Sequence, residues 1–153
     1  MSPVRFFSID DSLWPLLVIR LRGAPTDEHH AELLELSASY LRRREPYVVL
    51  TDMLHAGIST TAQRHRQMEW LGQHDKLLRE SLVGMGFILD SVFLRLALNV
   101  TIHVHPPVCP YIVVPRMDQA LAWAADRFDA SSLRGAAERI RRHETLQAST
   151  GTR

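Results

Sequence analysis

Apolar and polar residues follow one another in blocks along the chain, and the first two apolar blocks predict a β-hairpin. Residues 5–9 form a short apolar run, the polar turn Asp10-Asp11-Ser12 follows, and residues 16–21 are a dense run of Leu, Val, Ile and a single Arg. Two β-rich runs across a polar break are typical of paired strands. The string Arg22-Gly23-Ala24-Pro25 then ends the second run.

A helix and a buried strand are predicted next. Thr26 is a good N-cap, and Asp27 and Glu28 suit the positive end of a helix dipole. The apolar face of this helix, which reaches to about residue 44, consists of Leu33, Leu34, Leu36, Ala38 and Leu41. Pro46 prevents its continuation, and the unbroken β-rich run 47–50 predicts a buried strand.

The middle of the chain predicts a loop, a long helix and a strand. We expect a loop over residues 52–59, after which Ser59 or Thr60 caps a helix that reaches about Glu80. Residues 83–89 form the next strand. Gly84 and Gly86 weaken it, so we expect them to allow close packing of another element.

The last third predicts one segment of uncertain type, one strand and two helices. Ser91 caps an apolar helix over residues 92–98, whereas residues 100–104 fit either a strand by propensity or a continued helix, because no turn signal precedes them. Residues 111–114 predict a strand, and residues 117–128 a helix. Asp129 can cap a final amphipathic helix, with residues 147–153 as a frayed tail. The apolar stripe of that helix is Leu133, Ala136, Ala137 and Ile140.

Strands that alternate with helices imply an α/β fold: a mixed, mostly parallel sheet of four to five strands, with helices packed against it and an extra C-terminal helix. We expect residues 47–51, 83–89 and 111–114 among the inner strands, because their apolar character is unbroken. The order of strands and helices divides the chain into a domain over residues 1–128 and an amphipathic helix with its tail over residues 129–153. The stripe of that helix must be buried, either on its own sheet or against a second chain, and of these we favour a homodimer.

Composition and charge narrow the classes of function. The 18 basic and 17 acidic residues give a net charge of +1, so neither nucleic acid nor a membrane surface is indicated as a partner. The apolar run 82–89 is far shorter than the roughly 20 residues of a membrane span. The N-terminus lacks the pattern of a signal peptide and Cys109 is the only cysteine, so we expect a cytoplasmic protein. Lys76 is the only lysine, and this excess of arginine indicates a GC-rich bacterial genome.

Several local strings, in this order and spacing, resemble a known family. They are Val48-Val49-Leu50-Thr51-Asp52-Met53, Ser59-Thr60-Thr61-Ala62-Gln63-Arg64, Glu69-Trp70-Leu71, Leu82-Val83-Gly84-Met85-Gly86, Pro106-Pro107 and Ala120-Leu121-Ala122-Trp123. Over about residues 5–128 the chain resembles the SpoIIAA-like branch of the STAS superfamily, which includes bacterial anti-sigma-factor antagonists. The resemblance implies a non-enzymatic signalling module whose partner is a protein, such as an anti-sigma-factor-like or kinase-like regulator. The branch is also grouped with lipid-binding folds, so the alternative is a binder of a lipid-like or phosphate-containing small ligand.

The resemblance implies one specific site. Anti-sigma-factor antagonists carry a phosphorylatable serine where the helix after the third strand begins, and this chain has Ser59, Thr60 and Thr61 there. The Asp that usually precedes the serine and the Gly that follows it are absent. Arg64 and Arg66 lie in the first turns of this helix, where a phosphate or an acidic partner would offset their unfavourable placement near the helix dipole. The candidate partner surface therefore runs from Asp52 to Arg66, unless these arginines are simply solvated.

No catalytic or metal-binding pattern emerges from the sequence. It contains no Gly-x-Ser-x-Gly elbow and no Walker loop. The string from His103 through His105 to Cys109 has no standard zinc spacing, so a buried cysteine and two surface histidines are the better interpretation. We expect no catalytic residues, no metal and no cofactor.

Overall fold

A computed structural model of the chain describes residues 6–150, and their side chains as far as residue 144. Its five strands are β1 (Phe7–Asp10), β2 (Leu16–Gly23), β3 (Tyr47–Ala56), β4 (Leu82–Ile88) and β5 (Tyr111–Val114). They form one sheet in the order β1-β2-β3-β4-β5, in which β1 is antiparallel to β2 and every other pair is parallel. The predicted mixed, mostly parallel α/β sheet and its opening hairpin are therefore confirmed.

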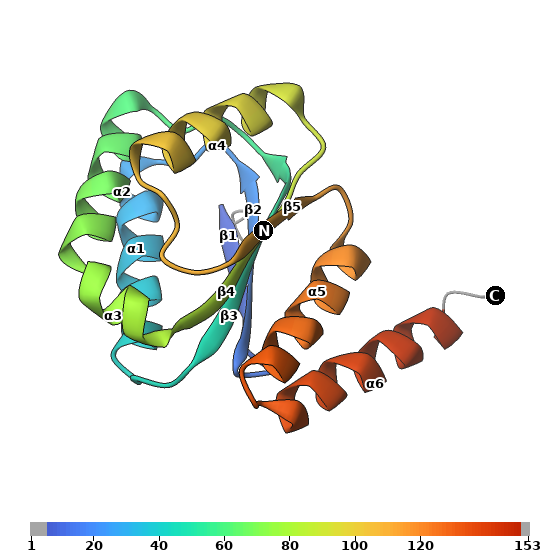
Figure 1. Ribbon diagram of the computed structural model, residues 1–153. Helices are drawn as coiled ribbons and strands as arrows, with labels where there is room; N and C mark the ends of the chain where they lie inside the picture. Colours follow the sequence, from blue (N-terminus) through green and yellow to red (C-terminus); the bar gives the residue numbers. More distant parts are fainter. Residues whose placement is uncertain (1–5, 151–153) are drawn as a thin grey trace.

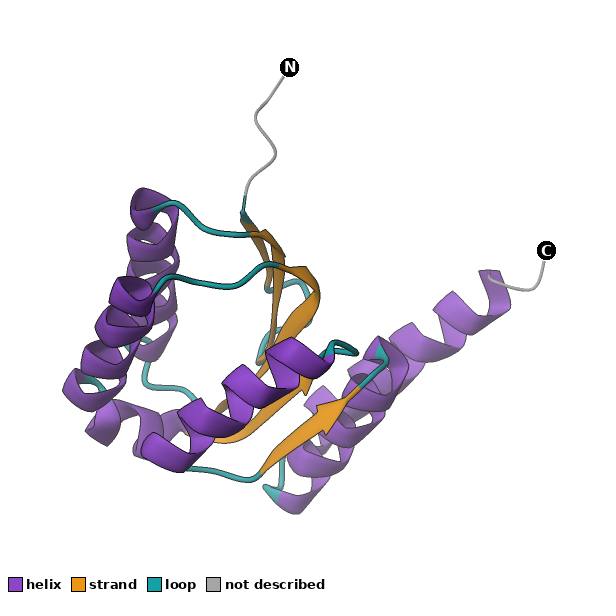
Figure 2. Cartoon of the chain, turned by 90° about the horizontal axis from the view of Figure 1, so that it is seen from above, coloured by secondary structure: helices purple, strands orange, loops and turns teal. Residues whose placement is uncertain are grey.

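The helices are divided between the two faces of the sheet (Figures 1 and 2). They are α1 (Asp27–Leu41), α2 (Thr61–Gln73), α3 (Asp75–Ser81), α4 (Val92–Val104), α5 (Met117–Ala130) and α6 (Arg134–Thr150). From β2 to β5, each crossover moves one strand in the same direction across the sheet. Because such crossovers are right-handed, α1 to α4 all lie on one face, and α5 and α6 cover the other.

The face covered by α5 and α6 is closely packed. Its core joins alternate residues of β2, β3 and β4 to the inner sides of both helices, including Leu16, Val48, Leu50, Ile88 and Phe128. The expected close approach at Gly84 is confirmed, because a Cβ atom there would lie 2.8 Å from Cη2 of Trp123 on α5.

The apolar stripe of α6 belongs to this same core. Ala136, Ala137 and Ile140 are buried against residues of α5 and the sheet. The stripe is therefore covered within the chain and does not supply the reason for a homodimer that we expected from the sequence. Asp129 lies inside α5, so it does not cap α6, which begins after a turn at Ser132 with φ of 62°.

Three further expectations need correction. Residues 111–114 form β5, which pairs with β4 alone and is an edge strand rather than an inner one. The strand at Tyr47 continues to Ala56, so most of the expected loop is β3. Residues 147–150 continue the backbone of α6 instead of fraying, whereas Arg5 and residues 151–153 lie outside the described residues.

The long helix predicted to run to Glu80 is broken into α2 and α3 at His74. The backbone N–H of His74 donates to the carbonyl of Trp70, and its ring Nδ1 lies 2.8 Å from the same oxygen while the ring stacks on the indole. This double use of one carbonyl accompanies the turn at His74, where φ is −104° and ψ is 10°.

The structure settles the open segment 100–104 as the end of α4. The Ser91 hydroxyl caps this helix by accepting from the N–H of Leu94, and the Thr101 hydroxyl donates to the carbonyl of Ala97. A helix satisfies its backbone hydrogen bonds internally, so this β-rich segment does not need a neighbouring strand.

Candidate functional site

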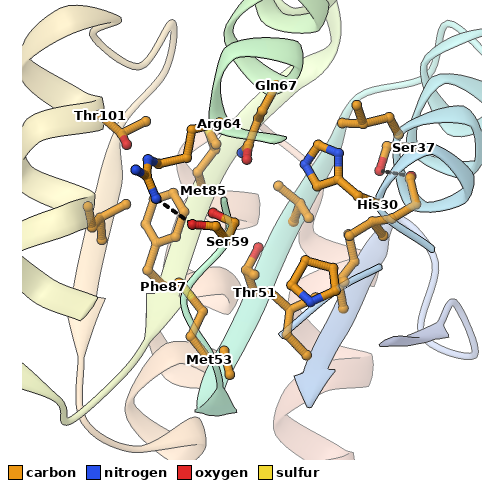
Figure 3. Close-up of a pocket in the computed structure, with 18 of the residues that line it drawn as sticks. His30, Ser37, Thr51, Met53, Ser59, Arg64, Gln67, Met85, Phe87 and Thr101 are labelled. Carbon is orange, nitrogen blue, oxygen red and sulfur yellow. Dashed lines mark hydrogen bonds between the residues drawn. The ribbon is translucent and has the colours of Figure 1, made fainter. Parts of the chain in front are cut away.

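A cavity of about 270 Å³ lies between the sheet and the layer formed by α1 to α4 (Figure 3). The sheet side is lined by β2, β3 and β4, and the other side by all four helices and by the loop that leads into α2. The apolar lining includes Leu17, Ile19, Leu33, Leu34, Val49, Met53, Trp70, Leu71, Met85, Phe87, Leu94 and Leu98. The cavity is thus a largely hydrophobic chamber in the middle of the fold.

The burial of the central strands shows why the two faces of the sheet differ. Val48 and Leu50 of β3 point toward α5 and are fully buried. Their neighbours Val49 and Thr51 point into the cavity and are only half-buried, although they lie in the middle strand of the sheet. Side chains alternate between faces along a strand, so this contrast reflects incomplete packing on the α1–α4 side.

His30 of α1 lies in the cavity wall, and its ring projects toward the interior (Figure 3). It is 5% exposed, and its Nδ1 is buried without a hydrogen-bond partner among the described residues. Burial, followed by the charge of Arg66, lowers the pKa of His30, while Asp27 acts in the opposite direction. The imidazole is therefore held neutral at pH 7, with an unmet hydrogen bond.

Arg64 of α2 places a cation at the cavity wall. Its guanidinium donates to the carbonyl of Ser59 and, over 3.1 Å, to the hydroxyl of Thr61. No carboxylate of the described residues forms an ion pair with it, and the described lining contains neither aspartate nor glutamate. The wall thus carries one positive charge with neutral partners only.

The start of α2 is held by a capping box. The Thr60 hydroxyl accepts from the N–H of Gln63, and the Gln63 side chain accepts from the N–H of Thr60. The Gln63 amide also donates to the carbonyl of Pro25 and to Oδ1 of Asp27, each over 3.0 Å. Sequence reasoning missed this buried residue, although the spacing Thr60-x-x-Gln63 is the signature of a capping box.

The structure brings together four of the six residues that we predicted as a partner or switch site. Ser59 is half-buried beside the cavity, while Thr60 and Thr61 are exposed at the N-terminus of α2 next to Arg64. Arg66 instead pairs with Asp27 of α1, 3.6 Å away.

The sixth predicted residue, Asp52, lies apart from the other site residues. Asp52 is inside β3, where Oδ1 accepts from the N–H of Leu54 and Oδ2 lies 3.8 Å from Nε of Arg20. Its neighbours Thr51 and Met53 line the cavity, so alternation directs Asp52 to the opposite face.

One helix is apolar on both sides. Leu94, Ala97, Leu98 and Thr101 of α4 line the cavity. The outer side of α4 carries Val92, Phe93, Leu96, Val100 and Val104, which are between 59% and 75% exposed. We call these five residues the α4 outer face. Sequence reasoning did not identify the α4 outer face. The signal that could have revealed it is the composition of residues 92–104, in which Arg95 is the sole Asp, Glu, Lys or Arg.

The described part of the chain offers few other candidate reactive or metal-binding groups. Cys109 is half-buried, and burial raises its pKa to about 11. The residues that the structure describes contain no group of three or more side chains suited to a metal ion. Across the same residues, no helix is long and apolar enough to cross a membrane.

Comparisons with known proteins find likeness in structure alone. No family model matches the sequence, and neither does any curated protein. An uncharacterised DUF3478 protein with a SpoIIAA-like fold from Shewanella loihica PV-4 matches with a TM-score of 0.59 and 17% identity, over 77% of this chain and 91% of that one.

Two further solved structures match more weakly. A chain of the complex between the diguanylate cyclase SiaD and its activator SiaC from Pseudomonas aeruginosa matches with a TM-score of 0.50 and 12% identity, over 74% of this chain and 96% of that one. An anti-sigma factor antagonist from Mycobacterium paratuberculosis matches with a TM-score of 0.49 and 14% identity, over 77% and 92%.

The sheet order and the likeness to the Shewanella loihica structure define an α/β domain with a SpoIIAA-like fold, extended by a C-terminal helix. The resemblance noted in the sequence is thereby confirmed at the level of the fold.

Proposed function

We propose that this chain is a non-enzymatic bacterial regulatory module that acts by binding a protein partner through the α4 outer face. The same fold occurs in a complex between an enzyme and its activator. The observation that carries the proposal is the exposure of this face, since soluble monomers rarely show a contiguous apolar surface without a use for it.

The geometry of the α4 outer face suits a protein groove or a partner helix. Val92, Leu96, Val100 and Val104 follow one another at intervals of four, which places them on one side of a helix roughly 20 Å long. A helix that lies on a membrane typically has a polar face rich in Lys and Arg. The side of α4 opposite to the stripe is apolar and faces the cavity, so a protein partner fits better.

The hydroxyl residues at the start of α2 would regulate this binding. Thr60 and Thr61 are exposed, and Arg64, which contacts Thr61, lies beside Thr101 of α4 (Figure 3). A phosphate on Ser59, Thr60 or Thr61 would add about two negative charges at the start of α2, close to the cavity-facing side of α4, and could pair with Arg64. A kinase-like or anti-sigma-factor-like regulator is the class of partner that such a site would serve.

The test compares surface variants in pull-downs from the native host. Phe93→Asp places a charge in the α4 outer face and should abolish capture of the partner that the parent protein retains. Leu36→Asp, at an exposed leucine of α1, is the matched control and should retain capture. Equal capture by the parent and Phe93→Asp would contradict the proposed surface.

The switch has its own test. Thr61→Glu should change partner capture relative to Thr61→Ala, and phosphate should be detected on protein purified from the native host. If both variants capture the partner as the parent does and no phosphate is found, the site is only a helix cap.

A second candidate function, the binding of a small ligand, is favoured by the cavity. Its volume of about 270 Å³ is close to the lower end of ligand pockets, about 300–1,000 Å³. Native mass spectrometry of protein purified from its own host should show an added mass that is lost on denaturation. A bare chain that also fails to bind an apolar dye would contradict this function.

A further inference from the structure

We propose that the cavity binds a single-chain amphiphile with one anionic head group, with the chain inside the cavity and the head group on Arg64. This inference rests on the second candidate function, the binding of a small ligand, and specifies its chemistry.

The size and lining of the cavity indicate the body of the ligand. The walls are formed mainly by Leu, Ile, Val, Met and Phe side chains from both layers, so burial of a hydrocarbon is favourable. About 270 Å³ is small for a ligand pocket, which favours one medium-length chain over a lipid with two chains. The ligand is thus a slender apolar molecule rather than a phospholipid.

The charge of the lining indicates the head group. Arg64 is half-buried, contacts only a carbonyl and a hydroxyl, and has no anionic partner among the described residues. A guanidinium has five N–H donors in a fork that fits a carboxylate or a phosphate. An anion would also meet no repulsion from the wall, because the described lining residues include no acid.

A comparison of His30 with Arg64 indicates which side of the cavity binds the anion. Its ring is also in the wall, but burial keeps it neutral, so Arg64 is the stronger site for negative charge. The Nδ1 of His30 has no partner among the described residues, and a buried polar atom in that state is costly. Figure 3 shows the side chains of His30, from α1, and Arg64, from α2, apart from each other in the helix layer, so an oxygen remote from the head group would complement His30.

The experiment uses displacement of a neutral apolar dye, N-phenyl-1-naphthylamine, from the full chain at pH 7.5. Dodecanoate, dodecanol and dodecylammonium are compared below their micellar concentrations. Dodecanoate should displace the dye at about tenfold lower concentration than dodecanol, and dodecylammonium should be the weakest, because a charge-assisted hydrogen bond is worth about a factor of ten or more.

Matched arginine variants locate the head group. Arg64→Gln should weaken dodecanoate about tenfold or more and leave dodecanol unchanged, while Arg64→Lys retains part of the preference. Arg66→Gln, two residues away on the same helix and paired with Asp27, should behave like the parent. Ala97→Phe fills the cavity and should weaken all three ligands; Thr101→Phe is a second filling variant in case the first does not fold.

The outcomes separate this inference from the function on which it rests. If neither the dye nor any amphiphile binds, ligand binding itself fails. If dodecanoate and dodecanol bind equally and Arg64→Gln changes neither, the cavity binds ligands but the anionic head group at Arg64 is wrong. If filling variants that fold leave binding unchanged, the ligand binds elsewhere and the inference is overturned.

Discussion

Replacement of Gln63 with methionine should destabilise the fold more than replacement of any other glutamine of α2 with methionine. Gln63 is 1% exposed, and its amide makes three hydrogen bonds of 3.0 Å, with the N–H of Thr60, the carbonyl of Pro25 and the carboxylate of Asp27. Methionine has a similar length but makes none of these bonds. The change therefore removes the network that joins the start of α2 to the start of α1.

The magnitude follows from the groups that lose their partner. The Thr60 N–H and the Pro25 carbonyl lie in a part-buried setting, while Asp27 is exposed and can be solvated by water. At about 0.5–1.5 kcal/mol for each bond, plus desolvation of the two backbone groups, the loss is about 3 kcal/mol. For a chain of this size that lowers the melting temperature by about 6–12 °C.

Chemical and thermal denaturation of the parent, Gln63→Met and Gln67→Met measures the effect. Gln67 is exposed on the same helix and makes no side-chain hydrogen bond among the described residues, so its variant should stay within about 0.5 kcal/mol of the parent. The reasoning is refuted if Gln63→Met loses under about 1 kcal/mol, or no more than Gln67→Met.

Three further predictions concern packing, pH and reactivity. Gly84→Ala should lower the free energy of unfolding by about 1–3 kcal/mol in urea denaturation, because the new Cβ would lie 2.8 Å from Trp123. Gly72→Ala has open space in α2 and should raise the free energy of unfolding by about 0.5–1 kcal/mol. Equal effects of the two substitutions would contradict the close approach at Gly84. Because burial lowers the pKa of His30, the unfolded chain binds a proton there first, so stability should fall as pH drops below about 6.5. His30→Phe should reduce this slope, and an unchanged slope would refute the cause. Since burial raises the pKa of Cys109 to about 11, its thiol should react with Ellman's reagent at pH 8 far more slowly in the folded than in the denatured chain; equal rates would contradict this.

The local signals of the sequence were sufficient for most elements of the fold. The hairpin, the strand at Tyr47 and the helix at Met117 follow from short-range periodicity and turn residues. Thr26 and Ser91 act as the caps that their positions predicted, because capping depends on only a few neighbouring backbone groups. The glycine at position 84 also predicted a close contact, although not the residue that makes it.

The candidate site was only partly predictable. The sequence identified the hydroxyl residues at the start of α2 and Arg64, since a loop followed by a capped helix is a local pattern. It placed Asp52 in a loop, although that residue lies inside a strand and points away from the cavity. It also missed His30 and Gln63, whose importance comes from burial against residues distant in the sequence.

By itself, the sequence determined the order of strands and helices, the type of sheet and the start of most helices, because these depend on residues a few positions apart. Only the tertiary structure decided that β5 is an edge strand and that α6 packs on its own chain. The same holds for the cavity and for the exposed side of α4. Hydrophobic periodicity reports that a side chain avoids water, but it does not report what covers that side chain or how closely two layers approach. Four helices held away from the sheet leave a chamber whose one cation and one neutral imidazole come from different helices, and only their packing brings them together.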